Sequence, residues 1–532
     1  MSALVENPEQ SCDLKVMSNI PGHEDVVRHR KSSRNGKIIL GIDIGTSSVK
    51  IALVDAQRGN LLQSGYKATK NCIGREEQVH VPGADLQDAL QIIRIVRSCL
   101  SVLDSHFMKA VSHVAICGQM HGVVMWNSAD VHTEQPTLSP LFTWQDQRCS
   151  SEFIEDLPRS QSHLRIATGY GCATLFWLLK HRPEYLTQFD RCGTVMDFVA
   201  LKLIGGDRAQ MSPQNAASWG FFNTIEEEWN HEILQNSGFP IDMLPKIVKV
   251  GSDIGTLTSS WGVIPVGVKV KAPMGDLQCS VRATFENPKT DAVVNVSTSA
   301  QISFVMDLGF TPPKVFDPDA TIEYLPYESG SYLATAASLN GGNVLDSFVR
   351  TLQQWSAFLL KQDEPKGGIP NNPAGVIPKR GGFNQDQIWT KLKLAAVEQS
   401  STELHMDPCI FGERHDADRR GSISNIGPEN CYHLGSVVLA MYQGIARNLS
   451  SMCPKDKLIE NGLTRIVGSG SCLIRNPGLI KAMEETFGLA VVEASSKEDL
   501  TNLELTNMAV DFNSKGNACV GAALFTMDYL KR

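Results

Sequence analysis

The sequence predicts an α/β protein built from two similar domains, and three observations support this fold class. The chain has 532 residues, which is too long for one ordinary hydrophobic core. Apolar strand candidates alternate along it with amphipathic helix candidates. Residues 41–55 align without a gap on residues 293–307, and both segments are typical of strand, hydroxyl-rich turn and strand. We expect a duplicated domain whose two hairpins face each other across a cleft, although so short a match could also arise by chance.

The composition is that of a globular protein, with 42% hydrophobic and 20% charged residues. The net charge of −8 argues against a dedicated nucleic-acid-binding protein. No apolar run is long enough to cross a bilayer, and the start of the chain has no signal-peptide core. The 13 cysteines are scattered without a C-x-x-C pair, so we expect free buried thiols and a cytoplasmic protein.

The ordered chain is expected to begin at Lys37, after a polar N-terminal tail (residues 1–36) that we interpret as flexible. The basic run near the end of this tail could instead be a localisation signal. Strands are predicted at residues 38–42, 49–54, 113–117, 123–126 and 465–467, helices at 433–452 and from about 477, and an exposed loop at 361–382. The boundary between the domains is expected between Asp276 and Asp291.

The first hairpin carries residues suited to bind phosphate and a metal ion. Gly45, Thr46 and Ser47 form a turn of small residues, which lets backbone N–H groups approach phosphate oxygens. Asp43, at the end of the strand, could hold Mg²⁺ through water, and Lys50 could reach a nucleotide phosphate. An ordinary hairpin with a polar turn is the alternative, and the segment is not a Walker A loop.

The second hairpin lacks the acid, because Asn295 aligns with Asp43. This asymmetry suits one metal-side carboxylate and one turn that binds only phosphate, with Thr298 as the candidate contact to the β- and γ-phosphates. Glycine-rich turns at Gly341-Gly342 and at residues 468–471 each follow a strand candidate and precede a helix. An adenosine could lie on the backbone of such turns, although each turn alone is a weak signal.

A polar cluster with an aromatic residue is predicted to bind sugar. Gln119, Met120 and His121 lie between two strand candidates, and Trp144 and Asp146 follow in the segment 143–148. Sugars are held by dense polar contacts and a flat apolar face, so this composition favours a carbohydrate pocket. Taken alone, His121 is more typical of a structural histidine.

Two further acidic segments allow alternative interpretations. Asp276 follows a glycine among apolar neighbours, so it could be a general base with a pKa tuned by desolvation, or merely a helix-capping aspartate. The charged run at residues 413–420 contains possible metal ligands, but a solvated, internally ion-paired loop is the favoured interpretation.

Together these motifs resemble the FGGY family of carbohydrate kinases, from Lys37 to the C-terminus. The matching elements are Asp-x-Gly-Thr-Ser at Asp43, Gly-Gln-Met-His-Gly at Gly118, Gly-Asp-Leu-Gln at Gly275, Ser-Thr-Ser-Ala-Gln at Ser297, Phe-Gly-Glu-Arg at Phe411 and the glycine turn at Gly468. Residues 338–343 and 412–416 look like the sedoheptulokinase branch. Xylulokinases, which share Gly-Gln-Met-His-Gly, are the nearest alternative within the family.

The resemblance implies two actin-like (ribonuclease H-like) domains around a central ATP and sugar cleft. The expected limits are residues 37–283 for the sugar-binding domain and 284–532 for the nucleotide-binding domain. The roles carried over are Asp276 as the base, Met120, His121 and Asp276 at the sugar, Asp43 at the metal, Thr46, Ser47 and Thr298 at the phosphates, and Gly341, Gly470 and Asn476 near the adenosine.

The implied reaction is transfer of the γ-phosphoryl group of ATP, with Mg²⁺, to a terminal hydroxyl of a ketose. Sedoheptulose is the first expected substrate, and its 7-phosphate would feed the pentose phosphate pathway. The alternatives are a kinase for xylulose, ribulose or another polyol, a catalytically weak sugar sensor, and a chaperone-type ATPase. We expect sugar and ATP as partners, no nucleic acid or membrane, and a monomer or homodimer. Departures from the family are Ser297 for a glycine, the N-terminal tail, and an insertion at residues 502–514 that could impair activity.

Overall fold

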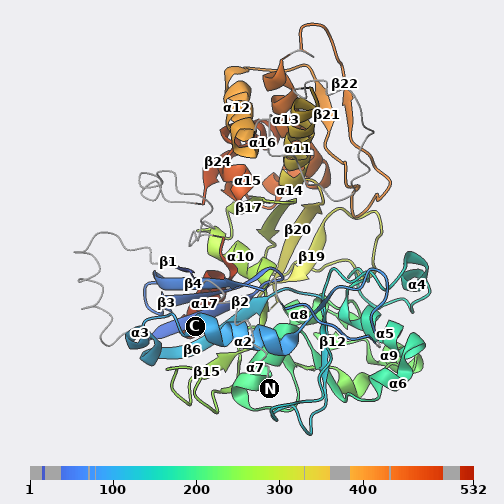
Figure 1. The fold of residues 1–532 in the computed structure, drawn as a ribbon, viewed down its shortest axis with the longest axis vertical. Helices are drawn as coiled ribbons and strands as arrows, with labels where there is room; N and C mark the ends of the chain where they lie inside the picture. The colour runs from blue at the N-terminus through green and yellow to red at the C-terminus, as the bar shows by residue number, and fades with distance from the viewer. Residues whose placement is uncertain are drawn as a thin grey trace, which may run out of the picture.

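The computed structural model describes residues 15–17, 37–69, 72–77, 79–328, 330–359, 384–430, 433–494 and 516–532. Two domains, each built on its own sheet, are stacked along the long axis of the molecule (Figure 1). The first sheet consists of β1 (Lys15–Met17), β4 (Leu61–Ala68), β3 (Ser48–Asp55), β2 (Ile38–Ile44), β6 (Val111–Gly118), β15 (Lys269–Lys271) and β14 (Asp253–Thr256), with β16 (Met274–Gly275) beside β6. The second consists of β19 (Glu323–Pro326), β20 (Tyr332–Ser338), β18 (Ala300–Val305), β17 (Asp291–Val296), β23 (Arg465–Ser469) and β24 (Ala490–Glu493).

The two sheets share a five-strand plan, which confirms the predicted duplication. In the first sheet, β4, β3 and β2 are antiparallel neighbours, and β6 and β15 follow in parallel to β2. In the second sheet, β20, β18 and β17 are antiparallel, and β23 and β24 follow in parallel. The central strands are buried on both faces, as in β2, in which all seven residues are buried, because helices cover each side of the sheet.

The two predicted hairpins differ by one residue at the turn. Ile44 pairs with Val49 in the first, whereas Val296 pairs with Ala300 in the second. The gap-free alignment therefore ends at the turn. As a result, Asp43 lies opposite Lys50, but Asn295 lies opposite Gln301.

Helices cover both sheets and add a helical region to the first domain. The first domain contains α2 (Ala89–Leu100), α3 (Ser105–Lys109), α4 (Ser151–Glu155), α5 (Gly171–His181), α6 (Pro183–Leu186), α7 (Val195–Ile204), α8 (Pro213–Ala217) and α9 (His231–Asn236). The second contains α11 (Gly342–Leu359), α12 (Gln385–Glu398), α13 (Leu434–Met452), α14 (Lys455–Glu460), α15 (Ser471–Ile474) and α16 (Pro477–Phe487). The small strand pairs are β5 (Leu86–Gln87) with β8 (Leu141–Phe142), β7 (Val124–Trp126) with β9 (Arg191–Gly193), β10 (Gln210–Met211) with β13 (Lys246–Ile247), β11 (Phe222–Asn223) with β12 (Glu228–Trp229), and β21 (His405–Asp407) with β22 (Ser422–Ser424).

Two helices join the domains through a shared core. They are α10 (Asp276–Thr284) and α17 (Ala518–Lys531), which pack closely against each other. Their apolar side chains share one buried cluster with residues of both sheets. Any side chain at Gly521 would collide with the Cys279 carbonyl, and any at Gly41 would collide with that of Cys519. Glycine is therefore required at both close approaches.

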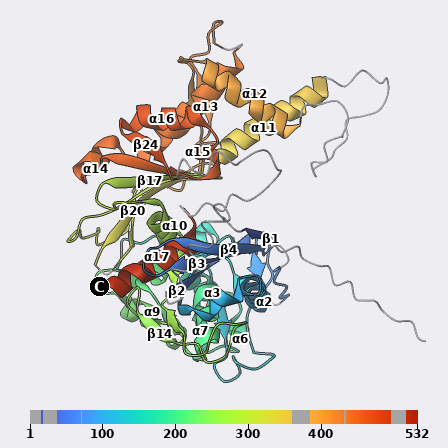
Figure 2. The ribbon, with the colours of Figure 1, turned by 90° about the vertical axis from the view of Figure 1, so that its left-hand side faces the viewer.

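The position of α17 bears on the expected domain limits. This helix lies in the segment 284–532, which we assigned to the second domain, yet it packs against β2, β3 and β6 of the first sheet. Figure 2 shows α17 beside the strands of the first domain, with α10 above it. The last helix thus belongs to the first domain by its packing, because its apolar residues cover one face of the first sheet.

Several remaining predictions concern surface features and the tail. Lys15–Met17 of the predicted tail pair with β4. The other residues of the segment 1–36, the loop 361–382 and the insertion 502–514 lie outside the described residues.

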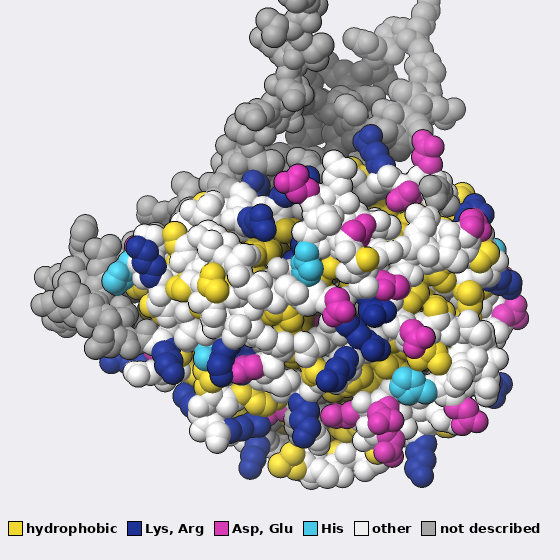
Figure 3. Space-filling model, turned by 90° about the horizontal axis from the view of Figure 1, so that it is seen from below, with side chains coloured by type: hydrophobic (Ala, Val, Ile, Leu, Met, Phe, Trp, Pro, Cys, Tyr) yellow, Lys and Arg dark blue, Asp and Glu magenta, His cyan; other side chains and the backbone are white. Residues whose placement is uncertain are grey.

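The described cysteines are free, and all but Cys472 are buried. No helix in the described part of the chain is long and apolar enough to span a membrane. On the face of the first domain in Figure 3, the described basic and acidic side chains are interspersed.

Candidate active site

Three parallel strands of the first sheet end at the same edge and bring the predicted site segments together. Ile44 of β2 pairs with Gly118 of β6, and Gly118 pairs with Gly275 of β16. Gly45, Gln119 and Asp276 follow these three residues directly in the sequence. The edge therefore joins the first phosphate turn, the predicted sugar loop and the predicted base.

Two carboxyl groups lie at this edge, Asp43, which is buried, and Asp276, which is half-buried. Burial raises the pKa of Asp43 to about 6, although the charge of Lys50, whose Nζ is 4.0 Å from Oδ2, opposes the shift. Burial, followed by the charge of Asp43, raises the pKa of Asp276 to about 7. Asp276 Oδ1 accepts a hydrogen bond of 2.8 Å from the Leu277 backbone N–H. A carboxylate with a pKa near 7 is matched to proton transfer at neutral pH.

His121 is held rigidly in the sugar loop in its neutral form. Its backbone has a φ of +76°, and its N–H donates to Ser218 Oγ at 3.1 Å. The ring stacks on Tyr170 at 4.3 Å, and Nδ1 lies 2.8 Å from the Ser218 carbonyl oxygen. Burial lowers the His121 pKa to about 4. Because a carbonyl only accepts, Nδ1 carries the proton, which leaves Nε2 as an acceptor for a sugar hydroxyl.

Met120 lies between this histidine and the base. A Cβ on Gly275 would come within 2.6 Å of Met120 Sδ, so the Met120 side chain covers the residue that precedes Asp276. Met120 is 6% exposed. The thioether therefore packs beside the residue that precedes Asp276, and its contact with a sugar stays a prediction.

A hydrogen-bond network connects the sugar side with the first phosphate turn. Trp144 Nε1 donates to Thr46 Oγ1 at 2.9 Å, and the indole is 42% exposed. Gln87 Nε2 donates to the Thr46 carbonyl at 2.8 Å, and Gln119 Nε2 donates to Gln87 Oε1 at 3.0 Å. Thr46, Ser47, Asp85 and Gln87 line an adjacent cavity of about 350 Å³. Asp85 and Gln87 were not predicted as site residues, because neither strand β5 nor the residue before it carries a recognisable motif.

Asp146 has a different position from the one its sequence context indicated. It is fully buried, and its oxygens accept from Arg148 Nε at 2.7 Å and Nη2 at 2.8 Å. It also accepts from the Asp85 N–H at 3.0 Å. The Arg148 guanidinium lies over the Phe142 ring. Since its carboxylate is already occupied, we assign Asp146 to the support of the Trp144 loop rather than to direct contact with sugar.

The glycines predicted near the adenosine support the second phosphate turn. The Gly342 N–H donates to the Ser297 carbonyl at 2.8 Å. Side chains at Gly341, Gly342 or Gly470 would collide with the backbone of the turn or of the strand before it, and Gly470 has a φ of +91°. The exposed Thr298 is at the tip of this turn. Backbone thus packs on backbone here, which leaves the turn amides in a fixed arrangement.

Asn476 is almost completely buried behind this region. Its Oδ1 accepts from the Tyr442 hydroxyl at 2.9 Å, and its Nδ2 donates to the Cys472 carbonyl. It precedes Pro477 at the start of α16. These bonds orient α16, and a contact of Asn476 with adenosine stays a prediction.

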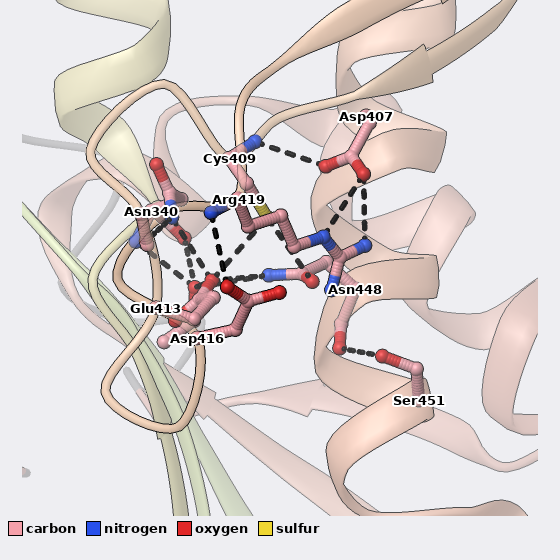
Figure 4. Close-up of polar contacts among 10 residues, drawn as sticks. Asn340, Asp407, Cys409, Glu413, Asp416, Arg419, Asn448 and Ser451 are labelled. Carbon is pink, nitrogen blue, oxygen red and sulfur yellow. Dashed lines mark hydrogen bonds and ion pairs between the residues drawn. The ribbon is translucent and has the colours of Figure 1, made fainter.

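The charged run at residues 413–420 is only partly the solvated loop that we favoured. Glu413 is 1% exposed and accepts hydrogen bonds from α13 and from the turn after β20 (Figure 4). The donors are Ser338 Oγ at 2.6 Å, the Leu339 N–H at 3.1 Å, Asn340 Nδ2 at 2.9 Å and Asn448 Nδ2 at 2.8 Å. Arg419 pairs with Asp407 at 2.8 Å. The described residues contain no group of three or more side chains suited to ligate a metal.

Known proteins match both the sequence and the fold. The family profile for the N-terminal domain of the FGGY family of carbohydrate kinases matches residues 38–281. A sedoheptulokinase of Homo sapiens is 41% identical over 467 residues, which are 85% of this chain and 93% of that protein. The chain belongs to the FGGY family of carbohydrate kinases. A Mus musculus sedoheptulokinase is 38% identical over 493 residues, 90% of this chain and 98% of the relative, in agreement with that FGGY assignment.

The solved structures support the FGGY fold independently of close sequence similarity. The xylulose kinase from Rhodospirillum rubrum superposes with a TM-score of 0.70 at 17% identity, and the match covers 92% of each chain. This similarity confirms the predicted two-domain actin-like fold. As a member of the FGGY family, the chain is a carbohydrate kinase that uses ATP.

Proposed function

We propose that this kinase transfers the γ-phosphoryl group of ATP to the terminal hydroxyl of a ketose, with sedoheptulose as the preferred substrate. The observation that carries the proposal is Asp276, a half-buried carboxyl group with a pKa of about 7 at the edge shared by the sugar loop and the first phosphate turn. The similarity to proteins named sedoheptulokinase supports the choice of sugar. The product would be sedoheptulose 7-phosphate, a substrate of the pentose phosphate pathway.

In the proposed reaction, Asp276 accepts the proton of the attacking hydroxyl. The hydroxyl oxygen then bonds to the γ-phosphorus as the bond to the leaving ADP oxygen breaks. Met120 and the Trp144 indole would provide apolar contacts to the sugar, and His121 Nε2 would accept from a hydroxyl. Such positioning is most of what phosphoryl transfer asks of a protein.

The nucleotide phosphates would lie between the two hairpin turns. Thr46 and Ser47 would bind from the first domain, with Lys50 neutralising charge, and Thr298 from the second. Gly341, Gly342 and Gly470 hold the second turn in place. Fixed backbone amides stabilise the charge that develops on the transferred group.

The residues present fit a Mg²⁺ ion beside Asp43. Asp43 Oδ1 is buried and has no hydrogen-bond partner among the described residues. Burial raises the Asp43 pKa to about 6. A nearby cation would lower this pKa again, because it favours the ionised carboxylate. A single carboxylate suits Mg²⁺, which keeps waters and takes phosphate oxygens as its other ligands. When bound, the ion would neutralise phosphate charge.

We further propose that the kinase acts in the cytoplasm as a monomer or homodimer, in keeping with its free thiols. Light scattering coupled to size-exclusion chromatography measures the mass directly. A mass other than one or two chains would contradict this part of the proposal.

The substrate is tested by coupled ADP release with Mg·ATP and sedoheptulose, xylulose, ribulose or glycerol, with a no-sugar control. We expect the highest kcat/KM with sedoheptulose and a phosphorus NMR signal coupled to the terminal CH₂ group of the product. Turnover restricted to a five-carbon ketose would retain the mechanism and reject the sugar. Folded protein that releases no ADP with any sugar would reject the kinase proposal in favour of a sugar sensor.

A further inference from the structure

A closed ring of hydrogen bonds connects the first phosphate turn with the loop after β6. Gln119 Nε2 donates to Gln87 Oε1 at 3.0 Å, and Gln87 Nε2 donates to the Thr46 carbonyl oxygen at 2.8 Å. Thr46 Oγ1 closes the ring by donating to Gln119 Oε1 at 3.4 Å. The three residues are far apart in the sequence, so this ring, which we call the glutamine ring, links three separate segments of the first domain.

The glutamine ring fixes the orientation of the Gln87 side chain. The Gln87 backbone is held in β5, opposite Leu141 of β8 and in a bridge with Ile73. If the Gln87 amide were turned over, its NH₂ group would face the NH₂ group of Gln119, and its oxygen would face the Thr46 carbonyl oxygen. Both hydrogen bonds would then be lost. The neighbours of Gln87 therefore favour one orientation, in which its N–H donor faces Thr46.

The Thr46 carbonyl group determines where the next backbone N–H points. It accepts a second hydrogen bond, of 2.6 Å, from Oγ1 of the buried Thr69. The peptide bond between Thr46 and Ser47 is trans, so the Thr46 C=O and the Ser47 N–H point in opposite directions. Because the carbonyl is directed at Gln87 and Thr69, the Ser47 N–H is directed away from them. Ser47 is exposed, and its N–H has no acceptor in the part of the chain that the structure describes.

The second hairpin holds the corresponding carbonyl with a different donor. Counted from the end of the preceding strand, Thr298 has the place of Thr46. The Thr298 carbonyl oxygen accepts from the Asn343 backbone N–H at 3.0 Å. The two copies of the fold thus hold the same carbonyl, one with side chains and the other with backbone. In the first hairpin, a side-chain substitution can therefore remove a bond that orients the turn.

We propose that Gln87 is a positioning residue that, with Thr69, holds the Thr46 carbonyl so that the Ser47 N–H faces a phosphate of the bound nucleotide. The inference rests on the proposed function, in which the phosphates lie between the two turns. A backbone N–H group that is already oriented stabilises the charge on the transferred phosphoryl group without reorganisation. Loss of the Gln87 donor should therefore lower kcat, with little effect on the affinity for sugar.

The test compares Gln87→Met and Gln210→Met with the unmodified kinase. Methionine keeps an unbranched side chain but has no N–H donor. Gln210 is the matched control, because its Nε2 donates to the Ile254 carbonyl oxygen at the same distance of 2.8 Å, elsewhere in the first domain. For Gln87→Met we expect kcat to fall about 3- to 10-fold, in line with the loss of one hydrogen bond. The sugar Kd from calorimetry should stay within about 2-fold of the parent value, and Gln210→Met should have the kcat of the parent.

A second variant keeps the test independent of the stability of Gln87→Met. Thr69→Val removes the other donor to the Thr46 carbonyl and should give the same pattern of kcat and sugar Kd. Because either donor alone can retain the carbonyl, the double variant should lose more in kcat than the product of the two single losses. A purely multiplicative double loss, or an unchanged kcat in both single variants, would overturn the inference. A weaker sugar Kd with normal kcat would also overturn it, since Gln87 would then contact the sugar.

Nucleotide binding separates this inference from the proposed function. If the parent kinase binds sedoheptulose but releases no ADP, the proposed function fails. The inference is then decided by the Kd of the magnesium complex of adenylyl imidodiphosphate, which keeps the non-bridging phosphate oxygens of ATP. A Kd about 3-fold or more weaker in Gln87→Met than in Gln210→Met would support the inference. Equal values, or a parent kinase that binds no nucleotide, would overturn it.

Discussion

The two hairpins have the same position in their sheets but different chemistry. The first carries Asp43 opposite Lys50, and the second carries Asn295 opposite Gln301. The charged pair of one domain is thus replaced by two amides in the other. The two copies of the fold therefore share their strands, but only the first carries the aspartate and the lysine.

The turns are also stabilised differently. Side chains hold the first turn, where Thr69 and Gln87 donate to the Thr46 carbonyl and Trp144 donates to the Thr46 hydroxyl. Glycine backbone packs closely on the second turn, where the Ser297 hydroxyl also donates to Asn295 Oδ1 at 2.9 Å. We infer that the first turn responds to the sugar through its side-chain network, whereas the second is a fixed support for phosphate.

Among substitutions that alter the way the two turns are held, Gly342→Ala is expected to have the largest effect. The new methyl group would collide with the Ser297 carbonyl and displace the second phosphate turn. Because small displacements of reacting groups are costly, kcat/KM for ATP should fall about 10²-fold or more. Gly206→Ala is the matched control, since a Cβ there meets no atom closer than 3.6 Å. Unchanged steady-state kinetics in Gly342→Ala would show that the turn is not fixed by this packing.

Exchanging the polar groups of the hairpins tests the charge asymmetry. Asp43→Asn gives the first hairpin the amide of the second, and we expect kcat to fall about 10²-fold because the metal-side carboxylate is lost. Asn295→Asp adds a second negative charge near the phosphates and should raise the KM for ATP about 10-fold. Full activity with Asn at position 43 in a magnesium titration would contradict the assigned role.

The pH dependence tests whether Lys50 tunes the two acids. Asp276 acts as a base only when ionised, and its pKa is about 7, so kcat/KM for the sugar should rise with pH up to about 7 and then level off. The charge of Lys50 lowers the pKa of both Asp43 and Asp276. Lys50→Gln should therefore move the acid limb to higher pH. The profile of Lys67→Gln, which removes a bond to Ser98 instead, should match the parent.

The smallest effect is expected for Trp144→Phe. Phenylalanine keeps an apolar face for the sugar but loses the hydrogen bond to Thr46 Oγ1. One such hydrogen bond makes a net free-energy contribution of about 0.5–1.5 kcal/mol. The KM for sugar should therefore rise about 3- to 10-fold, with kcat nearly unchanged. A greater loss in kcat than in KM would mean that the indole also orients the phosphate turn during the reaction.

Much of the fold could be predicted from the sequence. The strands at residues 38–42 and 49–54, the helix near residues 433–452 and the repeated hairpin depend on local patterns of apolar and turn residues, and the structure has them all. The return of α17 to the first sheet could not be predicted, because an apolar helix face does not specify which sheet it covers. The shorter second turn was hidden because its sequence aligns without a gap.

The candidate site was predicted in part, and the misses have physical causes. The convergence of Asp43, Gln119 and Asp276 follows from motifs at the ends of three strands. Asp146 and Glu413 were misjudged because a charged residue in a polar segment favours a solvated position on average. Their burial depends on contacts with segments distant in the sequence, such as Asn448 for Glu413 and the Asp85 N–H for Asp146.

Asp276→Asn tests the central claim most directly. The amide has nearly the same size as the carboxyl group but cannot accept the proton of the sugar hydroxyl. We predict that kcat falls about 10²-fold or more, while calorimetry gives a sugar Kd within about 3-fold of the parent value. Near-normal turnover by the folded variant would contradict the account, because Asp276 would then not be the base.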